Sequence, residues 1–475
     1  MLCLLAGSSA LSCSVYDSTL IDGGQAKPDG GSHGGAGMHA MGLDADIDAA
    51  ADSGEDGTDA SDAETGGASG TGGGAGGAGG AGSSAGTGGS AGGGGTLADA
   101  GPCMPGTGAD CCPNDPKKTD PGVCGCGTPD SDADFDGLVD CGDPALGWEK
   151  AITFDGAQVD ATLTAFPALV RITDSELAAS AASDAADIYF LDQAHATLLV
   201  HEIERYDATS GALLAWVRVP ELAAATDTVI YLRYGGGGTD RSDPTALWSD
   251  HYYVWHLAED PGPGTAGGIR DSTGRAPGTA HSTMLSSDLV DAVIGKGIRF
   301  DGVDDEITFT NTFTGSGPST LSAWVNQLVD NDGVSDTILA FGNGSANQTR
   351  LFYSAQTMTN NLVGGFYNND KDSAVSIENA GWSHVAWVWD GTSSRFYVNG
   401  ALASGPLAHT GANTTGTPGK IGNATWAARP LRGQLDEVRA ESTTRSDAWI
   451  KAEYNNQRAG TFLKTLGPQQ AVTPP

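Results

Sequence analysis

The chain is poor in positive charge, has no cysteine after Cys141 and contains no long apolar run. Its 475 residues include 24 Lys and Arg against 59 Asp and Glu, a formal net charge of −35. Nucleic acids and anionic membranes attract clustered Lys and Arg, so this balance argues against both as partners. No segment is apolar enough for long enough to cross a bilayer. The composition favours a well-solvated exterior protein whose carboxylates could hold a hard cation.

The first residues are apolar over a short stretch only. Leu2 to Leu11 is too brief to span a bilayer, and it ends in Ala10-Leu11-Ser12-Cys13. This ending resembles a bacterial lipobox, which implies that Cys13 is lipidated and becomes the first residue of the mature protein. We therefore expect residues 1–13 to direct export. The protein would be anchored by lipid on the outer side of the cell envelope, or secreted, with no other membrane contact.

Residues 14–102 consist mainly of Gly, Ala, Ser, Thr and Asp, with runs such as Gly92 to Gly95. Such a segment cannot bury enough apolar surface to offset its ordering entropy. The sequence predicts a disordered tether here.

Residues 103–146 hold six cysteines and too few apolar residues for a core. In an exported chain such density favours disulfides, with the pairing left open. Zinc is the rival, but no histidine lies between the first and last of these cysteines, and Cys-x-Cys is not a zinc-finger spacing. The expected disulfide residues are Cys103, Cys111, Cys112, Cys124, Cys126 and Cys141.

An acidic run follows the lead-in Pro121 to Gly127 in the same segment. Its carboxylates recur at every second position before Gly137, an arrangement that can wrap a Ca²⁺ ion with its preference for 6–8 oxygens. The run resembles a thrombospondin type 3-like calcium repeat, and the alternative is an acidic linker. The predicted calcium ligands are Asp130, Asp132, Asp134, Asp136, Asp140 and Asp143.

From residue 147 onward the sequence turns to short strands. Leu213 to Val219 alternates with both faces at least partly apolar, as expected within a sandwich. Trp387 and Trp389 point the same way along one strand and are expected in a core. Asn399-Gly400 is a strong hairpin-turn signal. We predict an all-β protein with two β-sandwiches, residues 147–245 and 246–465, and a tail at 466–475.

Seven blocks in order across about Trp248 to Phe462 resemble the concanavalin A-like laminin G family, whose fold is a jelly roll. They are Trp255 to Leu257, Asp271 to Gly274, Gly297 to Asp305, Leu321 to Trp324, Trp382 to Ala386, Tyr397 to Gly400 and Gly433 to Val438.

The preceding segment is similar to the bacterial surface family called domain of unknown function 2341. The matching pieces are Phe166 to Val170, Asp187 to Phe190, Ala215 to Pro220 and Ile230 to Gly235. This family is commonly followed by the same lectin-like domain, but it brings no known activity.

The laminin G resemblance implies a calcium ion at a loop rim beside a ligand surface. Asp271, Asp301 and Asp436 are the expected ligands, while Asp304 is as well explained as a turn residue. Trp426 and Tyr367 stand in loop-like contexts and could stack on a pyranose ring. The competing explanation is partly buried packing.

Signs of catalysis are missing. There is no Gly-x-Ser-x-Gly elbow between a strand and a helix, no His-Glu-x-x-His, and no metal or catalytic spacing among the nine histidines. The nearest approach to a glycosidase Glu-x-Asp-x-x-Glu strand is Gln434 to Glu437. There Gln434 replaces the first acid, and Asp436 and Glu437 are expected on opposite faces. We therefore expect no enzyme.

Taken together, the sequence predicts a surface binding or adhesion protein with structural calcium. Its laminin G-like domain would recognise carbohydrate or a glycosylated partner. A scaffold of the cell envelope that docks a surface protein without glycan is the alternative, and a glycoside hydrolase on the same fold comes third.

Overall fold

The computed structural model describes residues 146–328, 333–355, 360–460 and 462–472, together with Cys112, Asn114, Lys118, 122–127, Asp130 and Asp132. The predicted export signal with Cys13, the tether, and the predicted site residues Cys103, Cys111, Cys141, Asp134, Asp136, Asp140 and Asp143 lie outside the described residues.

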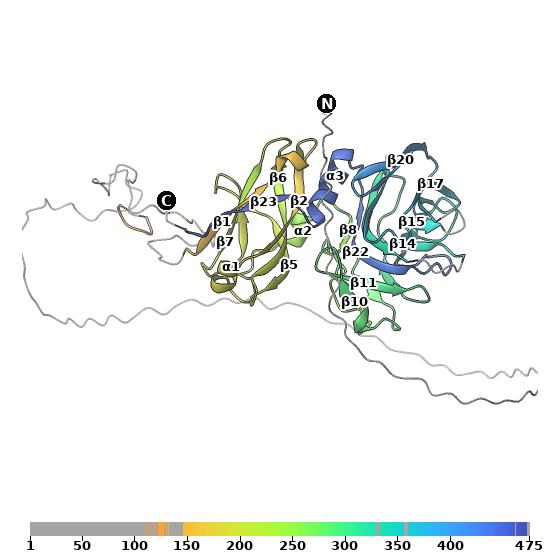
Figure 1. Ribbon diagram of the computed structural model, residues 1–475, viewed down its shortest axis with the longest axis horizontal. Helices are drawn as coiled ribbons and strands as arrows, with labels where there is room; N and C mark the ends of the chain where they lie inside the picture. The colour runs from red at the N-terminus through yellow and green to blue at the C-terminus, as the bar shows by residue number, and fades with distance from the viewer. Residues whose placement is uncertain are drawn as a thin grey trace, which may run out of the picture. The chain divides into compact units, whose positions relative to one another are not determined.

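The first sandwich packs a six-stranded sheet on a three-stranded one (Figure 1). The larger sheet has the order β23-β1-β7-β3-β4, with β24 also paired to β1, and the smaller has the order β2-β6-β5. The bounds are β1 Trp148–Phe154, β2 Leu163–Thr173, β3 Tyr189–Leu191, β4 Leu198–Leu199, β5 His201–Asp207, β6 Ala212–Leu222, β7 Thr228–Tyr234, β23 Leu463–Leu466 and β24 Gln470–Ala471. A short helix, α1 (Ser175–Ser180), follows β2.

The alternation of β6 explains its place in this sandwich. Leu213, Ala215, Val217 and Val219 enter the core between the two sheets, while Leu214 and Trp216 join a second apolar cluster on the opposite face. The two-faced pattern predicted from the sequence is thereby confirmed.

The end of the chain returns to this first sandwich. β23 pairs antiparallel with β1 through Ile152 and Leu466, and β24 pairs with the start of the same strand through Trp148 and Ala471. Phe462 is buried in the first core against Phe154, at 6.0 Å between ring centroids. The sequence predicts residues 246–465 in the second domain and 466–475 as a tail. In the structure β23, which spans that boundary, and β24, which follows it, both pair with β1 of the first sandwich.

The second sandwich is a jelly roll of two antiparallel sheets, with the orders β10-β11-β22-β13-β18-β19-β20, plus β8 beside β22, and β17-β16-β15-β14-β21-β12-β9. The strands of the eight-stranded sheet are β8 Tyr253–Trp255, β10 Leu289–Asp291, β11 Lys296–Asp301, β13 Ser319–Gln327, β18 Ser383–Trp389, β19 Ser393–Val398, β20 Ala401–Ala408 and β22 Arg432–Glu441. Those of the seven-stranded sheet are β9 Thr279–Ala280, β12 Ile307–Thr310, β14 Asp336–Gly342, β15 Thr349–Ala355, β16 Asn361–Phe366, β17 Asn369–Ser376 and β21 Pro418–Ile421.

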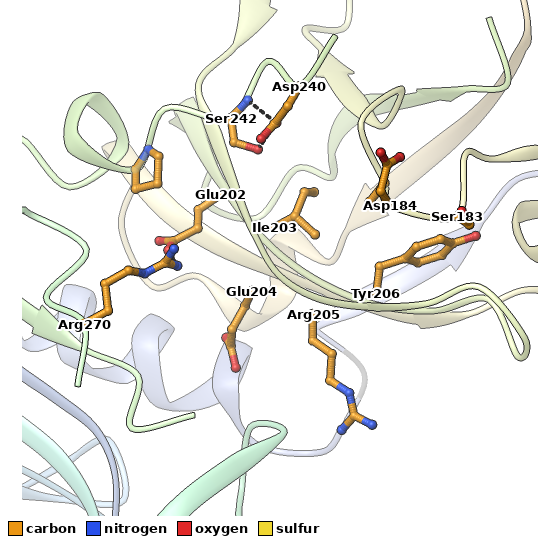
Figure 2. A pocket seen from close by; sticks show the side chains of 12 residues that line it. Ser183, Asp184, Glu202, Ile203, Glu204, Arg205, Tyr206, Asp240, Ser242 and Arg270 are labelled. Carbon is orange, nitrogen blue, oxygen red and sulfur yellow. Dashed lines mark hydrogen bonds and ion pairs between the residues drawn. The ribbon is translucent and has the colours of Figure 1, made fainter. Parts of the chain in front are cut away.

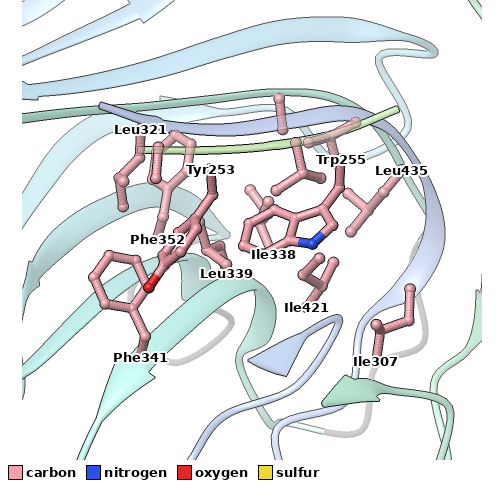
Figure 3. Close-up of a cluster of buried hydrophobic side chains, with 14 of the residues drawn as sticks. Tyr253, Trp255, Ile307, Leu321, Ile338, Leu339, Phe341, Phe352, Ile421 and Leu435 are labelled. Atoms are coloured by element: carbon pink, nitrogen blue, oxygen red, sulfur yellow. The ribbon is translucent and has the colours of Figure 1, made fainter. Parts of the chain in front are cut away.

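Aromatic and branched side chains from both sheets fill the jelly-roll core (Figure 3). Trp387 and Trp389 lie inside it at 0% and 1% exposure, which confirms their predicted place. Their neighbours on β18, Ala386 and Val388, point to the opposite face and belong to the core cluster of the first sandwich. The period-two pattern of β18 therefore serves two cores at once.

Helix α3 (Asp447–Gln457) joins the two sandwiches. Its Trp449 and Ile450 pack in the core cluster of the first sandwich. A separate cluster of Leu169, Trp216, Trp248, Val254 and Ile294 lines the junction, with Leu247 from the one-turn helix α2 (Pro244–Leu247) completing it. The two sandwiches therefore share buried apolar surface.

Within the cysteine-rich segment, Cys112 and Cys126 form a disulfide. Cys124 is also disulfide-bonded. Across the described residues, no helix combines the length and apolarity that a bilayer crossing needs.

Candidate functional site: a cleft around Trp426

A loop between β21 and β22 lies over the outer face of the seven-stranded sheet and carries Trp426. The Gly422 amide donates to the Ile338 carbonyl at 3.0 Å, and the Thr337 amide donates to Arg429 at 3.2 Å, so both ends of the loop are bonded to β14. The Asn423 side-chain oxygen accepts the Arg429 amide at 2.7 Å and closes the loop. These bonds fix the position of the indole between them.

Gly344 allows the indole to sit this close to the sheet. Its φ of +71° is a left-handed conformation, and a Cβ at this position would lie 2.8 Å from Cβ of Trp426. A side chain here would therefore displace the tryptophan.

On one side of Trp426 lies a pocket of about 170 Å³. Trp426 and Tyr367 meet there with ring centroids 5.1 Å apart and ring planes inclined at 45°, and both side chains are half-buried. The structure thus brings together the two residues predicted to stack on a sugar. The other lining residues are Ser335, Thr337, Leu351, Tyr353, Asp370 and Arg429.

The pocket floor mixes acidic and basic groups. Burial raises the pKa of the Asp370 carboxyl, and the neighbouring Tyr353 hydroxyl offsets part of this rise. Burial and the Asp370 charge likewise raise the pKa of Tyr353 above its usual range. Oδ1 of Asp370 has no hydrogen-bond partner among the described residues. An unsatisfied carboxylate oxygen, a hydroxyl and the Arg429 guanidinium suit a neutral ligand rich in hydroxyl groups.

On the other side of Trp426 lies a second pocket, of about 400 Å³, so the indole forms a wall between two hollows. Glu306 is fixed in this pocket by Lys420 at 2.7 Å and by the Asn423 amide at 2.9 Å. His281 and Asp304 also line it. Trp426 lines both hollows, and we refer to the two hollows with the indole between them as the cleft.

An acidic turn after β11 borders the second pocket. Carboxylate oxygens of Asp301, Asp304 and Asp305 lie within 4.8 Å of one another. Asp305 accepts the Asp301 amide at 2.9 Å, and Thr283 donates to Asp304 at 3.0 Å. Burial, together with the charges of Asp301 and its neighbours, raises the pKa of Asp305 to about 6. Crowded carboxylate oxygens of this kind fit a Ca²⁺ ion.

The other two predicted rim ligands lie elsewhere. Asp271 is buried and uses both oxygens to hold its own loop, accepting the Val254 amide at 2.9 Å and the Ala276 amide at 2.8 Å. Asp436 is fully buried at the junction of the sandwiches and accepts the Ile294 amide at 2.8 Å. Neither is in the carboxylate group of Asp301, so the three nominated residues do not form one site.

In the cysteine-rich segment, Asp130 and Asp132 are the predicted calcium ligands that fall among the described residues. Asp130 accepts the Cys124 amide at 2.8 Å and an ion pair from Lys118 at 2.9 Å. These contacts lower the pKa of Asp130.

One expectation about orientation was wrong. Leu435 and Val438 both enter the jelly-roll core, although strict alternation would turn only one of them inward. A β-bulge in β22 opposite β13, with Glu437 at a φ of +53°, accounts for the change. Asp436 and Glu437 therefore both face the first sandwich rather than opposite sides of the strand.

Several cleft residues were not identified from the sequence. Glu306 is 114 and 117 residues away in the chain from its partners Lys420 and Asn423, and no local motif links it to them. The pair Lys420 and Asn423, flanking a turn just before Trp426, is the nearest thing to a local signal.

The fold and the cleft define a concanavalin A-like jelly roll joined to a second β-sandwich. Residues 301–451 match the family described as the Concanavalin A-like lectin/glucanases superfamily. Residues 184–252 match a domain of unknown function, DUF2341. Both family resemblances are confirmed over these ranges. The likeness to a thrombospondin type 3 repeat stays a prediction.

Solved structures with similar folds come from several kinds of protein. Domain 4 of AbnA, a GH43 extracellular arabinanase from Geobacillus stearothermophilus, solved with arabinotriose, is 18% identical with a TM-score of 0.33, over 42% of this chain and 97% of that one. The binding domain of Paraclostridial Mosquitocidal Protein 1 is 15% identical with a TM-score of 0.34, over 44% and 52%. The Trypanosoma rangeli sialidase is 11% identical with a TM-score of 0.31, over 49% and 41%. No curated protein matches the chain.

Proposed function

We propose that this protein is a non-catalytic carbohydrate-binding protein of the outer cell surface, and that the cleft around Trp426 is its glycan site. In this proposal Cys13 carries a lipid anchor and residues 14–102 act as a tether. The two sandwiches then present the cleft to glycans outside the cell.

The observation that carries the proposal is the position of Trp426. Its half-buried indole separates two hollows, stands 5.1 Å from the Tyr367 ring and is surrounded by hydrogen-bonding groups. The apolar face of a pyranose packs on aromatic rings, while its hydroxyls bond to fixed polar groups. Glu306, Lys420 and Arg429 supply such groups around the indole.

Calcium enters the proposal at the acidic turn. Asp301, Asp304 and Asp305 would provide the carboxylate oxygens, and bound Ca²⁺ would neutralise their mutual repulsion. Because Asp304 also lines the second pocket, the ion would stabilise one wall of the glycan cleft. Sugar binding is then expected to depend on calcium.

A glycan array probed with the full chain, in calcium and again in EDTA, tests the proposal. We expect binding to a coherent set of sugars that weakens when calcium is removed. Trp426→Ala should reduce affinity about tenfold or more, since loss of one stacking face is worth about 1.4 kcal/mol.

Trp148→Ala is the matched control, because Trp148 is a partly exposed tryptophan on the first sandwich, away from the cleft. It should leave glycan binding unchanged. If the folded wild type binds no sugar in either buffer, the scaffold function becomes the better hypothesis, and envelope proteins should then be sought as partners.

A further inference from the structure

A second group of functional side chains lies at the junction of the two sandwiches. Glu204 on β5, His256 just after β8 and Glu437 on β22 bring one carboxylate or imidazole ligand atom each to within 4.8 Å of one another. The side chains are nearly buried, at 4% exposure for Glu204, 4% for His256 and 1% for Glu437. Nδ1 of His256 faces both carboxylates, at 2.7 Å from Glu437 Oε1 and 3.8 Å from Glu204 Oε2.

We propose that Glu204, His256 and Glu437 form a binding site for one divalent transition-metal ion, of the zinc or manganese class, which ties the two sandwiches together. One imidazole with two carboxylates is a donor set that suits such ions, whereas Ca²⁺ prefers oxygen alone.

The surroundings of His256 favour a ligand role for Nδ1. The opposite nitrogen, Nε2, lies 3.3 Å from Glu202 Oε2. Glu202 is held in turn by the Trp248 indole at 2.7 Å and the Ser272 hydroxyl at 2.9 Å. Both ring nitrogens donate to carboxylates here, Nε2 to Glu202 and Nδ1 to Glu437. A metal ion would replace the proton on Nδ1, while Glu202 would keep the N–H of Nε2 and orient the ring.

The two carboxylate ligands are also fixed from outside the group. Trp216 donates its indole N–H to Glu204 Oε2 at 2.8 Å, and Arg439 donates to Glu437 Oε2 at 2.6 Å. Oε1 of Glu437 is then the oxygen that faces the imidazole. Such preorganisation fits a built site better than an accidental meeting of charges.

Both carboxylates sit on backbone irregularities. Glu437 belongs to the bulge of β22 and has a φ of +53°. Glu204 is the extra residue of a bulge in β5, between the pairs Ile203 with Ala215 and Arg205 with Leu214. Bulges redirect side chains, and a left-handed φ at a glutamate costs free energy that the fold must offset elsewhere. Two bulges that aim carboxylates at one histidine indicate a functional arrangement.

Among the described residues, Glu204 forms an ion pair with His256 but with no arginine or lysine. Arg270 bonds to Glu202 and Arg439 bonds to Glu437, which leaves Glu204 beside the shared imidazole. Asp436, adjacent in the chain and fully buried, keeps its Oδ1 without any hydrogen-bond partner in the described part of the structure. The nearby Arg171 guanidinium donates to the Val293 and Gln457 carbonyls. A divalent cation would give the buried Glu204 carboxylate a second cationic partner.

Glu204 also borders a pocket. A pocket of about 480 Å³ at the edge of the first sandwich is lined by Glu202, Glu204, Arg205 and Arg270 (Figure 2). Figure 2 shows Glu202 and Glu204 extending from the same strand, with Arg270 reaching toward Glu202. Of the three proposed ligands, Glu204 is the one that lines this pocket.

Manganese binding to the full chain tests the site, with excess calcium present to occupy oxygen-only loops. We expect electron paramagnetic resonance to count one tightly bound Mn²⁺ with a coupled imidazole nitrogen. We also expect Zn²⁺ to raise the melting temperature by about 5 °C. His256→Gln should abolish the nitrogen coupling, and Glu204→Gln should weaken Mn²⁺ binding at least tenfold.

Glu204→Gln keeps the size of the side chain and an oxygen to accept from Trp216, so it should fold even if His256→Gln does not. Glu306→Gln, at the glycan cleft, is the matched control and should bind Mn²⁺ as the wild type does. The proposal is overturned if the wild type binds no ion beyond what Glu204→Gln binds. It is equally overturned if the bound ion shows no nitrogen coupling. Either result is separate from the outcome of the glycan assay.

Discussion

The side-chain amide of Asn456 on helix α3 bonds to both backbone groups of Leu169, the amide and the carbonyl, on the edge strand β2. Its Oδ1 accepts the Leu169 amide at 2.6 Å, and its Nδ2 donates to the Leu169 carbonyl at 3.1 Å. β2 is an edge strand of its sheet, so the side chain replaces a neighbouring strand at this point. One amide thus connects helix α3 to the first sandwich.

Asn456→Ala should lower the free energy of unfolding by about 2–3 kcal/mol, because it leaves a buried amide and a buried carbonyl unpaired. Chemical denaturation followed by tryptophan fluorescence measures this loss. Asn413→Ala, at an exposed position, is the control and should change stability by less than about 0.5 kcal/mol. Equal stability of the two variants would show that the bonds to Leu169 contribute little.

Phe462→Ala should destabilise the first sandwich although it lies near the end of the chain. Phe462 is 2% exposed and packs against Phe154 and Phe166. Removal of a buried phenyl ring costs about 3–5 kcal/mol. Thermal melting and proteolysis at sites in β1 should both report the change. Gln470→Ala in the exposed β24 should melt as the wild type does, and a similar result for Phe462→Ala would contradict the role of the C-terminal segment.

His384 should make the protein sensitive to acid. Burial lowers the pKa of His384 from 6.5 to about 4, against a small opposing effect of Glu453, and Arg439 adds to the lowering. In the unfolded chain His384 therefore takes up a proton near pH 6.5, whereas in the folded chain it stays neutral until about pH 4. Proton binding to His384 therefore does not affect the free energy of unfolding above pH 6.5. As the pH falls from 6.5 toward 4, the free energy of unfolding decreases by up to about 3 kcal/mol.

The variant His384→Phe should remove this part of the acid sensitivity, because its neighbours Trp324 and Tyr454 are aromatic. Urea denaturation at several pH values between 4 and 8 measures the difference from the wild type. His281→Gln, at a partly exposed histidine, should run parallel to the wild type. If the difference between His384→Phe and the wild type does not change with pH, His384 is not the source.

Calcium should raise the melting temperature of the full chain by about 5 °C relative to EDTA, by binding to the folded state alone. In the double variant Asp301→Asn with Asp304→Asn, calcium should raise the melting temperature less, because the acidic turn no longer binds the ion. Asp130→Asn with Asp132→Asn should lose the part of the rise that comes from the cysteine-rich segment. Asp291→Asn, which only breaks an exposed pair with Lys296, is the control. An unchanged melting curve in EDTA would remove calcium from the proposed function.

Regular alternation is what the sequence could predict. Val385, Trp387 and Trp389 share one face of β18, and that face is the jelly-roll core, since every second residue of a strand points the same way. Bulges escaped prediction for the same reason. One extra residue at Glu204 or Glu437 reverses the faces that follow, and nothing in the local composition marks it.

The cleft was predictable only in part. Trp426 and Tyr367 stood out as aromatics among turn-forming residues, and the structure brings them together. Their polar neighbours, such as Glu306, Asp370 and Lys420, come from distant segments that meet only when the seven-stranded sheet has formed. Glu204, His256 and Glu437 likewise come from three segments that are far apart in the chain. The sequence around His256 alone therefore gave no sign of a metal site.

The return of β23 to β1 has a consequence for biogenesis. On the ribosome β1 emerges early, and the edge that pairs with β23 stays unpaired until β23 has been made. All strands of the jelly roll lie between β1 and β23 in the chain. The jelly roll can therefore fold before β23 completes the first sandwich. A nascent chain that ends before Phe462 should therefore have a folded jelly roll, while the edge of β1 in the first sandwich stays unpaired. Such an exposed strand edge is prone to aggregation, and we expect proteases or chaperones to bind the truncated chain at this edge.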